Sequence, residues 1–435
     1  MSASPNNDHS CGWIKTLSPR AARPTLSGNK RCKWLVIGAG YSGLSAALTL
    51  AENQVDDEVI LLDANLAGEG ASSRNSGFLV DATLNDGHLQ DTGLKAYKSK
   101  YELNLKALET VRALIRKYNI DCNWNECGRY YASANGNTEN KLRTFNDLLN
   151  SFEIANTFIE GGALSDRLGT DFYKMAVKTH GGALLQPAAL ARGMVDALPS
   201  NVTLYENTAV TSISQGPPHT VKCTGYEIIT DNLIVAINGF MPSLGLKQNR
   251  VFPLLLTASM TRPLTQEEQA QMKFVDEWGV ISADAMGATV RYTRDKRLMI
   301  RNTVEVSTSL KMNSKELAKR QKIHLQGLAK RFPFLPDDIF VHCWSGITCI
   351  SANNANIFEK VCNNYWLIGC YNGGGIGLST LFGQQIAYQA MAEPQTIADK
   401  IRQRPQASWL PPQPFLNIGI RAKLAANRFT AKADS

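Results

Sequence analysis

A strand, a glycine-rich turn, a helix start and a second strand ending in an acid follow one another near the start of the chain. The apolar run 33–37 leads into Gly38-Ala39-Gly40-Tyr41-Ser42-Gly43, and Asp63 ends the next apolar run. In a G-x-G-x-x-G turn, the first glycine permits a tight bend, the second lets the backbone approach a pyrophosphate, and the third lets the helix pack on the strand. The helix also directs unpaired N–H groups at phosphates. We therefore predict a dinucleotide site, in which Asp63 accepts hydrogen bonds from an adenosine ribose and Ala64 is a neighbouring contact.

The length and composition indicate a soluble globular protein of two domains. A chain of 435 residues is too long for one simple core, and 44% hydrophobic with 19% charged residues is ordinary for this class. No apolar run approaches the ~20 residues that a membrane helix needs. Residues 1–30 are polar, hold three prolines and lack the apolar core of a signal peptide. We expect them to form an irregular leader of a cytoplasmic protein.

The cysteine pattern and the net charge limit which metals and binding partners we expect. Nine cysteines are scattered along the chain, and no cluster of cysteine and histidine completes a metal site. Reduced thiols and no bound metal are the simpler interpretation. The net charge of +8 is spread along the chain, and residues 396–435 form a basic tail. We expect a solvated tail and no nucleic-acid binding, while a weak contact of the tail with a membrane surface stays open.

The pattern of segments suggests that the chain leaves the nucleotide domain and returns to it twice. An amphipathic helical pattern covers 91–119, a short strand is expected at 128–132, and a further helix is expected from about 138 to 160. Strand patterns recur from 202 onward, and the last strand–turn–helix lies at 365–391. The predicted cofactor domain takes 31–90, 175–250 and 341–395, and the substrate domain takes 91–174 and 251–340.

A second glycine cluster, Asn372-Gly373-Gly374-Gly375-Ile376-Gly377, lies between an apolar strand and a helix. Such a turn aims backbone N–H groups and a helix dipole at an electron-rich group. If the first turn holds a pyrophosphate, the second can hold the pyrimidine edge of a flavin, where it favours the negative charge of the reduced ring. Taken alone, the cluster is equally consistent with an ordinary glycine-rich connection.

Four segments together resemble the FAD-dependent amine and amino-acid oxidases of the D-amino-acid oxidase and sarcosine oxidase superfamily. The second and fourth of them look most like the gamma-glutamylputrescine oxidase branch. The four segments are Gly38 to Gly43 with Asp63; residues 70–77, with the core Arg74-Asn75-Ser76-Gly77; residues 235–239; and Trp344-Ser345-Gly346 continuing to residues 369–377. The resemblance implies an α/β fold, in which a Rossmann-like FAD-binding domain is interleaved with an α+β substrate domain built on an antiparallel sheet.

The resemblance also implies where FAD is bound. Ser72, Ser73 and Arg74 would line the pyrophosphate and ribityl part, although Arg74 could instead form a surface salt bridge. Asn75, Ser76 and Gly77 would lie close to the isoalloxazine. Further expected contacts are Val210 for the adenine, Gly373 to Gly377 for the pyrimidine ring, and Asn238 and Gly346.

Some positions depart from the resembled proteins. Where many carry Thr-x-Asp, this chain has Ser351-Ala352-Asn353. The position that holds a covalent flavin cysteine in some members aligns with Gly346, although Cys343 and Cys349 flank it, so we expect non-covalent FAD. A lysine that speeds the reaction with oxygen in some oxidases aligns with Met299 or Ile300.

The resemblance implies catalysis mainly by placement. The unprotonated amine would lie with its α C–H over flavin N5 and lose a hydride equivalent, and the imine product would then hydrolyse. No side-chain base is required, and none is assigned. Four residues are substrate candidates: Arg301, whose guanidinium suits a carboxylate, then Tyr292, Arg291 and His342.

The predicted function is therefore FAD-dependent oxidation of a C–N bond in a small amine or amino acid. A cyclic amino acid such as pipecolate or a polyamine derivative would fit, with oxygen or an electron carrier as acceptor. Two alternatives stay open: a dehydrogenase that passes electrons to a quinone or carrier, with the basic tail docked on a membrane, and a flavoprotein component of a larger complex. An NAD(P) dehydrogenase would leave the second glycine cluster and the 70–77 loop unexplained.

Overall fold

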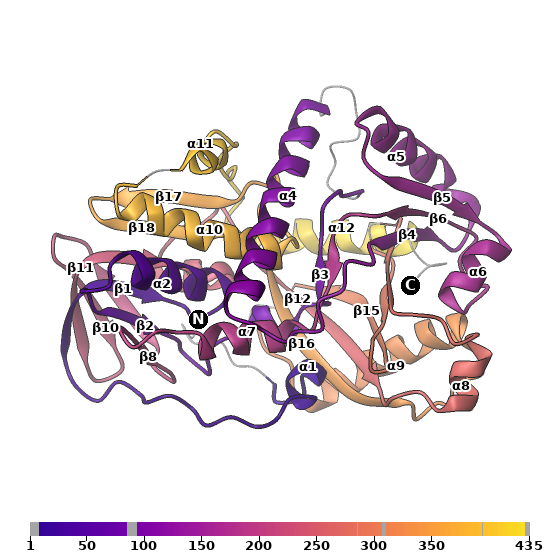
Figure 1. Cartoon of the computed structure of the whole chain (residues 1–435), viewed down its shortest axis with the longest axis horizontal. Helices are drawn as coiled ribbons and strands as arrows, with labels where there is room; N and C mark the ends of the chain where they lie inside the picture. Colours follow the sequence, from indigo (N-terminus) through magenta and orange to yellow (C-terminus); the bar gives the residue numbers. More distant parts are fainter. Residues whose placement is uncertain (1–7, 85–93, 285, 307–309, 394, 431–435) are drawn as a thin grey trace.

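The computed structural model describes residues 8–84, 94–284, 286–306, 310–393 and 395–430. Two large sheets lie side by side, each covered by helices (Figure 1). This arrangement confirms the predicted α/β class, with one largely parallel and one largely antiparallel sheet.

The first sheet has a parallel centre in the order β18-β11-β1-β2-β8. The strand β1 (Lys30–Ile37) lies in the middle, and its last four residues are buried, as a strand covered on both faces requires. The other strands of this sheet are β2 (Val59–Leu62), β8 (Val202–Tyr205), β11 (Glu227–Val235), β18 (Tyr365–Gly369), the antiparallel edge strand β17 (Ile357–Cys362), and β9 (Val210–Ser214) with β10 (His219–Cys223), which extend from β11.

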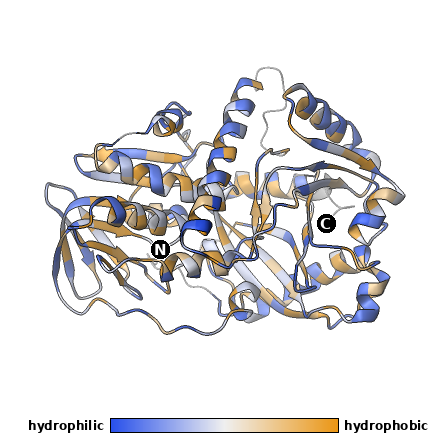
Figure 2. Ribbon diagram, viewed as in Figure 1, coloured by the Kyte–Doolittle hydropathy of each residue, from blue (hydrophilic) through white to orange (hydrophobic). Residues whose placement is uncertain are grey.

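Helices α2 (Tyr41–Asn53) and α10 (Gly375–Ala390) pack against each other over the first sheet, with α4 (Leu94–Lys117) and α7 (Pro187–Asp196) beside them. Hydrophobic residues run along the strands beneath them (Figure 2). The close packing depends on Gly43, because a Cβ atom there would lie 1.7 Å from the carbonyl oxygen of Gly38. The third glycine of the turn therefore has the packing role predicted for it.

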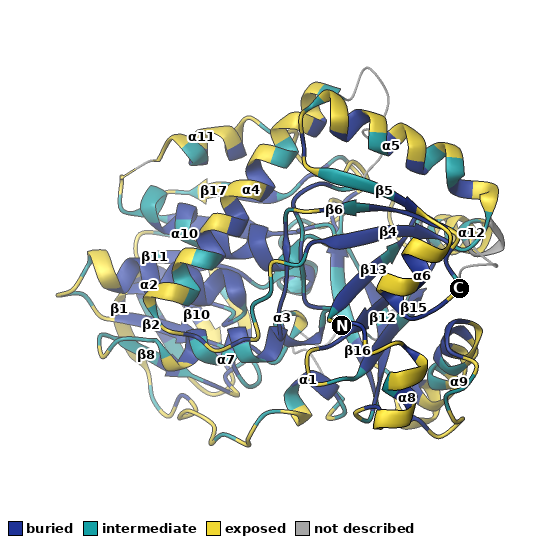
Figure 3. Cartoon of the chain, turned by 45° about the vertical axis from the view of Figure 1, so that its right-hand side comes forward, coloured by how far each residue is buried: buried dark blue, intermediate teal, exposed yellow. Residues whose placement is uncertain are grey.

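The second sheet has the order β16-β12-β15-β14-β13-β4-β6-β5 and is antiparallel except where β13 meets β4. Its strands and those of the first sheet are largely buried, whereas α5, α6 and α8 expose their outer sides (Figure 3). The strands are β4 (Arg129–Ser133), β5 (Asn156–Glu160), β6 (Met175–Thr179), β12 (Phe252–Thr261), β13 (Trp278–Ser282), β14 (Thr289–Tyr292), β15 (Leu298–Glu305) and β16 (Phe340–Ile350). The helices that accompany it are α5 (Glu139–Ser151), α6 (Gly162–Leu168), α8 (Gln266–Gln271) and α9 (Ser314–Arg331).

Two predicted domain boundaries differ from the strand pairing. Strand β6 pairs with β4 and β5, and β16 pairs with β12, so both belong to the antiparallel sheet. The sequence patterns had placed residues 175–179 and 341–350 in the cofactor domain. Between 138 and 160 the chain also forms a helix and then the strand β5, not the single helix expected there.

Residues 8–30 and 396–430 each contain helices that the sequence patterns did not predict. Residues 8–16 include the short helix α1 (Gly12–Lys15), whose Trp13 is buried, while no helix or strand is assigned from 16 to 29. The predicted basic tail holds α11 (Thr396–Arg402) and α12 (Phe415–Thr430). Short elements complete the fold: the pair β3 (Phe78–Leu79) and β7 (Ala183–Leu184), α3 (Ala71–Arg74), and the 3-10 helices η2 (Gly136–Thr138) and η3 (Asn238–Leu244).

Candidate active site

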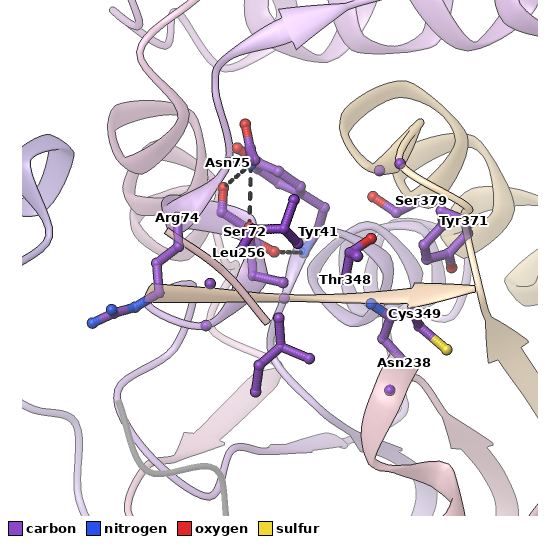
Figure 4. Close-up of a pocket in the computed structure, with 18 of the residues that line it drawn as sticks. Tyr41, Ser72, Arg74, Asn75, Asn238, Leu256, Thr348, Cys349, Tyr371 and Ser379 are labelled. Atoms are coloured by element: carbon purple, nitrogen blue, oxygen red, sulfur yellow. Dashed lines mark hydrogen bonds between the residues drawn. The ribbon is translucent and has the colours of Figure 1, made fainter. Parts of the chain in front are cut away.

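A cavity of about 670 Å³ lies where the two sheets meet, and its wall draws on both. Figure 4 shows residues of the 70–77 loop and of helices α2 and α10 around the cavity, together with Leu256 of β12 and Thr348 and Cys349 of β16. Sixteen of the expected cofactor residues line the cavity: Gly38, Gly40, Tyr41, Ser42, Asp63, Ala64, Ser72, Arg74, Asn75, Ser76, Val210, Asn238, Gly346, Gly373, Gly375 and Ile376.

The other six expected cofactor residues do not line the cavity, and three of them have packing or hydrogen-bonding roles next to it. Gly43 and Gly377 are packing positions, since a Cβ on Gly377 would lie 2.8 Å from Leu79 Cδ1. Ser73 donates to the Gly68 carbonyl. The remaining three are Ala39, Gly77 and Gly374.

Three helix N-termini at the cavity have glycine as N-cap and no side-chain cap: α2 at Gly40, α3 at Gly70 and α10 at Gly374. Residues of each turn line the cavity. The first N–H groups of a helix lack partners within the helix, so such ends present donors and positive partial charge. At α2, the Tyr41 N–H is already used, because it donates to Ser72 Oγ at 3.0 Å. The Tyr371 hydroxyl joins two of the turns through a 2.6 Å hydrogen bond with Ser42 Oγ. No sequence pattern singled out Tyr371, which also lines the cavity.

Asp63 stands at the end of β2, where its carboxylate accepts hydrogen bonds from the backbone N–H groups of Ala39 (2.8 Å) and Asn65 (2.9 Å). The carboxylate therefore fixes the glycine turn, and its remaining lone pairs are available to a ligand in the cavity. Burial raises the pKa of Asp63 to about 6, because desolvation outweighs the two backbone hydrogen bonds.

The Arg74 guanidinium points away from the cavity (Figure 4). It pairs with Asp8 at 3.0 Å and donates to the carbonyls of Ser345 (2.9 Å) and Glu69 (3.1 Å). Arg74 thus lines the cavity, while its charge is paired with that of Asp8 in the N-terminal segment. Trp13 also ties that segment to the loop, because its Nε1–H donates to the Asn75 carbonyl at 2.9 Å. The sequence patterns gave no signal for these contacts.

Of the four substrate candidates, Arg301 alone lines the cavity. The pairing of β12 with β15 contains a bulge at this residue. Thr257 and Ser259 are two residues apart, whereas their partners Thr303 and Ile300 are three residues apart. Successive strand residues point to opposite faces, so Arg301 lines the cavity while Ile300 packs in the core of the second sheet. The bulge lets Val304, three residues further on, line the cavity as well. One Arg301 Nη donates to the Thr289 hydroxyl at 2.5 Å.

Arg301 has no carboxylate within ion-pair distance among the residues that the structure describes. Desolvation lowers its pKa to about 10, which still leaves it charged at neutral pH. An arginine that is desolvated without a counter-ion costs stability unless an anion joins it.

The other three candidates lie outside the cavity wall. Arg291 is buried, pairs with Glu277 at 2.8 Å and donates to the Leu185 carbonyl at 2.6 Å. It also donates to the Ser76 carbonyl at 3.3 Å, so it braces the 70–77 loop. Tyr292 packs beside Trp278 in the core of the second sheet. The half-buried His342 has a lowered pKa because of its burial and the nearby cations.

Apolar residues form the part of the cavity near Arg301, including Leu256, Ile281, Met286 and Val304. Leu424 of α12 joins this wall, and Ile420 packs on the same cluster. The predicted solvated tail therefore closes one side of the cavity. No helix in the described part of the chain is long and apolar enough to cross a membrane.

Comparison with known proteins supplies the identity of the fold. Residues 33–389 match the family DAO, described as FAD dependent oxidoreductase. Gamma-glutamylputrescine oxidoreductase of Escherichia coli (strain K12) is 26% identical over 377 residues, which cover 83% of this chain and 84% of the relative. A probable oxidoreductase, OrdL, of Rhizobium meliloti (strain 1021) is 24% identical and covers 90% of both chains.

Solved structures show the same fold. Glycine oxidase from Geobacillus kaustophilus superposes with a TM-score of 0.71 at 19% identity, over 84% of this chain and 96% of that one. L-proline dehydrogenase from P. horikoshii superposes with a TM-score of 0.68 at 15% identity, over 85% and 95%. Since the family match spans most of the chain, this protein belongs to the DAO family of FAD-dependent oxidoreductases.

Proposed function

We propose that this enzyme oxidises the C–N bond of a small amine or amino acid that carries a carboxylate, and that Arg301 binds this carboxylate. The single observation that carries the proposal is the cation without a counter-ion in the cavity wall. A substrate carboxylate would satisfy the guanidinium through paired, charge-assisted hydrogen bonds. The names of the similar proteins, which refer to gamma-glutamylputrescine, glycine and L-proline, support an amine or amino acid as the substrate class.

The cavity residues fit FAD, the cofactor of the family. Gly40 lies so close to Ser72 that a Cβ atom would come within 2.9 Å of its Oγ, whereas a Cβ atom on Gly70 or Gly375 would have no neighbouring atom within 4 Å. The backbone at the last two positions is therefore open to a ligand. We assign the pyrophosphate to the Gly38–Gly43 turn, the ribose to Asp63, and the pyrimidine ring to Gly373 through Gly377.

FAD supplies the hydride acceptor when it is bound, and the chain's own residues position the substrate. Arg301 fixes one end of the substrate by its carboxylate, which leaves the amine end to lie toward the glycine turns. Leu256, Met286 and Leu424 exclude water from this region, which favours the unprotonated amine that the reaction needs. No side chain is required as a base, in keeping with catalysis by placement.

We also propose that FAD is held without a covalent bond. Gly346 occupies the expected attachment position, and Cys343 does not line the cavity. Cys349 does line it, but the hydrogen bond that its thiol donates to Cys370, together with burial, raises its pKa well above the usual value, so its thiol is a poor nucleophile. Denaturation and ultrafiltration should release all of the FAD; yellow colour retained on the protein would contradict the proposal.

The electron acceptor is oxygen or a carrier. The position expected for an oxygen-activating lysine holds Met299 or Ile300, and both are buried. We therefore propose a dehydrogenase that uses a quinone or another carrier as the second candidate. Slow re-oxidation of the reduced enzyme by air, together with fast re-oxidation by a soluble quinone, would support the second candidate, and the reverse order would reject it.

The Arg301→Met variant tests the carboxylate proposal. We expect kcat/KM for a carboxylate-bearing amine to fall on the order of 100-fold, because a charge-assisted hydrogen bond contributes roughly 1.5–3 kcal/mol. The same variant should lose much less on the matching amine without a carboxylate. Arg297→Met is the matched control, because Arg297 lies on the neighbouring turn, pairs with Asp295 and does not line the cavity. Equal losses in both variants, or on both substrates, would reject Arg301 as the carboxylate contact.

A further inference from the structure

Helix α12 is apolar on two opposite faces. Its inner face carries Ile420 and Leu424, which pack on the cluster of Leu254, Met286 and Val304 at the cavity. Its outer face carries Phe415 and Ile418, whose exposed fractions are 66% and 63%. In Figure 1, α12 (yellow) lies against the second sheet, where it contacts β15. An ordinary surface helix has one apolar stripe, so the second face needs its own explanation.

The outer face is continuous and bounded by cations. With about 100° per residue, five residues fall within an arc of about 100°. These five are Phe415, Ile418, Ala422, Ala425 and Ala426, and all are exposed. Arg421 lies at one edge of this arc and Lys423 at the other, and both are exposed. Neither has a carboxylate partner among the described residues.

The sequence around α12 has one sign of charge. Residues 400–433 contain no Asp or Glu, and seven cations: Lys400, Arg402, Arg404, Arg421, Lys423, Arg428 and Lys432. Lys400 and Arg402 pair with Glu102 and Asp399 outside this stretch, whereas Arg421 and Lys423 flank the outer face of α12. Trp409, which precedes the helix, is 60% exposed. An exposed tryptophan, an apolar helix face and flanking cations are the features of a helix that lies in the plane of a membrane interface. Long cationic side chains at the edges can reach the headgroups while the apolar face is buried.

We propose that the outer face of α12, with Trp409, docks on an anionic lipid surface. A second copy of this chain fits the face less well, because a two-fold pairing would bring Arg421 and Lys423 close to their own copies without any acid between them. Docking would hold the enzyme at the surface and would not span the bilayer. Leu424 of the same helix lines the cavity, so docking places the cavity next to the lipid.

Vesicle sedimentation with the purified FAD-loaded chain tests the proposal without reference to any substrate. We expect the protein to sediment with vesicles of phosphatidylcholine mixed with phosphatidylglycerol, and far less with phosphatidylcholine alone. Binding should weaken as salt is raised, because screening reduces the attraction between the cations and the headgroups.

Two double variants separate the apolar from the electrostatic contribution. Phe415→Ser with Ile418→Ser, and Arg421→Gln with Lys423→Gln, should each weaken binding to the anionic vesicles on the order of tenfold or more. These side chains are exposed, so the thermal unfolding temperature and the FAD content should stay unchanged. Phe274→Ser is the matched control, because Phe274 is 64% exposed on another part of the chain.

Three results would overturn the proposal. The protein could stay in the supernatant with anionic vesicles, or the Phe274→Ser control could lose as much binding as the α12 variants. Finally, association of the chain with itself in the absence of lipid, reduced by the α12 variants, would assign the outer face to a second copy.

Discussion

Asp63 is a half-buried residue at the cavity, and the desolvation of its carboxylate has an energetic cost. Its two backbone hydrogen bonds hold the glycine turn, yet desolvation raises its pKa to about 6. The folded protein therefore binds a proton more tightly at this residue than the unfolded chain does. The stability that this tighter proton binding adds to the folded state is complete below the unfolded pKa near 3.8, and it is lost as the pH rises through about 6.

We predict that Asp63 makes the FAD-free protein less stable as the pH is raised from 4 to 7. Over this range, the free energy of unfolding of the natural chain should fall by roughly 2 kcal/mol relative to that of the Asp63→Asn variant. Urea unfolding of both proteins at several pH values measures it. A constant difference would mean that the pKa of Asp63 is not raised.

Individual residues also show which features can be predicted from local sequence patterns. The glycine turn of residues 38–43 was predicted because its geometry depends on neighbours within the same strand–turn–helix. The orientation of Arg291 could not be predicted, because its partners Glu277 and the Leu185 carbonyl lie far away in the sequence. Arg301 was assigned to the substrate for the chemistry of its guanidinium, and the bulge that lets Arg301 and Val304 line the same cavity has no sequence signature here.

At the element scale, the N-terminal segment 8–16 contacts the 70–77 loop that lines the cavity. Asp8 and Arg74 form an ion pair whose side chains are 9% and 4% exposed. Burial would raise the pKa of Asp8, but the charge of Arg74 and hydrogen bonds from Ser345 outweigh it and hold the pKa below its usual value. The pair therefore stabilises the fold above the unfolded pKa, and this contribution is lost as the pH falls through the folded one.

We predict that Asp8→Asn lowers the free energy of unfolding by about 3 kcal/mol and weakens FAD binding, because it leaves the buried Arg74 without a counter-ion. Glu139→Gln, which breaks an exposed pair with Arg143, should cost less than about 1 kcal/mol. Urea unfolding and FAD titration of the two apoproteins compare them. If Asp8→Asn behaves like Glu139→Gln, the segment does not anchor the loop.

Prediction of elements from the sequence was best where one face of the element is apolar. The amphipathic pattern at 91–119 became α4, although 91–93 lie outside the described residues. Helix α12 was missed because its apolar residues lie on two opposite faces, so no single stripe marks it.

At the scale of the whole molecule, the order of the strands decides where the site forms. The sequence indicated that the chain returns to the first sheet, and β8, β11 and β18 all join it. Which sheet β6 and β16 would join could not be predicted, because strand pairing depends on partners that are distant in the sequence. The consequence is functional: β16 carries Gly346 from the second sheet to the cavity.

We propose that a bound flavin accepts electrons from an amine that the enzyme holds by its carboxylate. The most direct test is the visible spectrum of the purified protein during anaerobic addition of amines, with and without a carboxylate. We predict flavin absorption that is bleached by a carboxylate-bearing amine, and bleached far less by its counterpart without the carboxylate. Flavin absorption that no amine or amino acid bleaches, or equal bleaching by both members of a pair, would contradict the account.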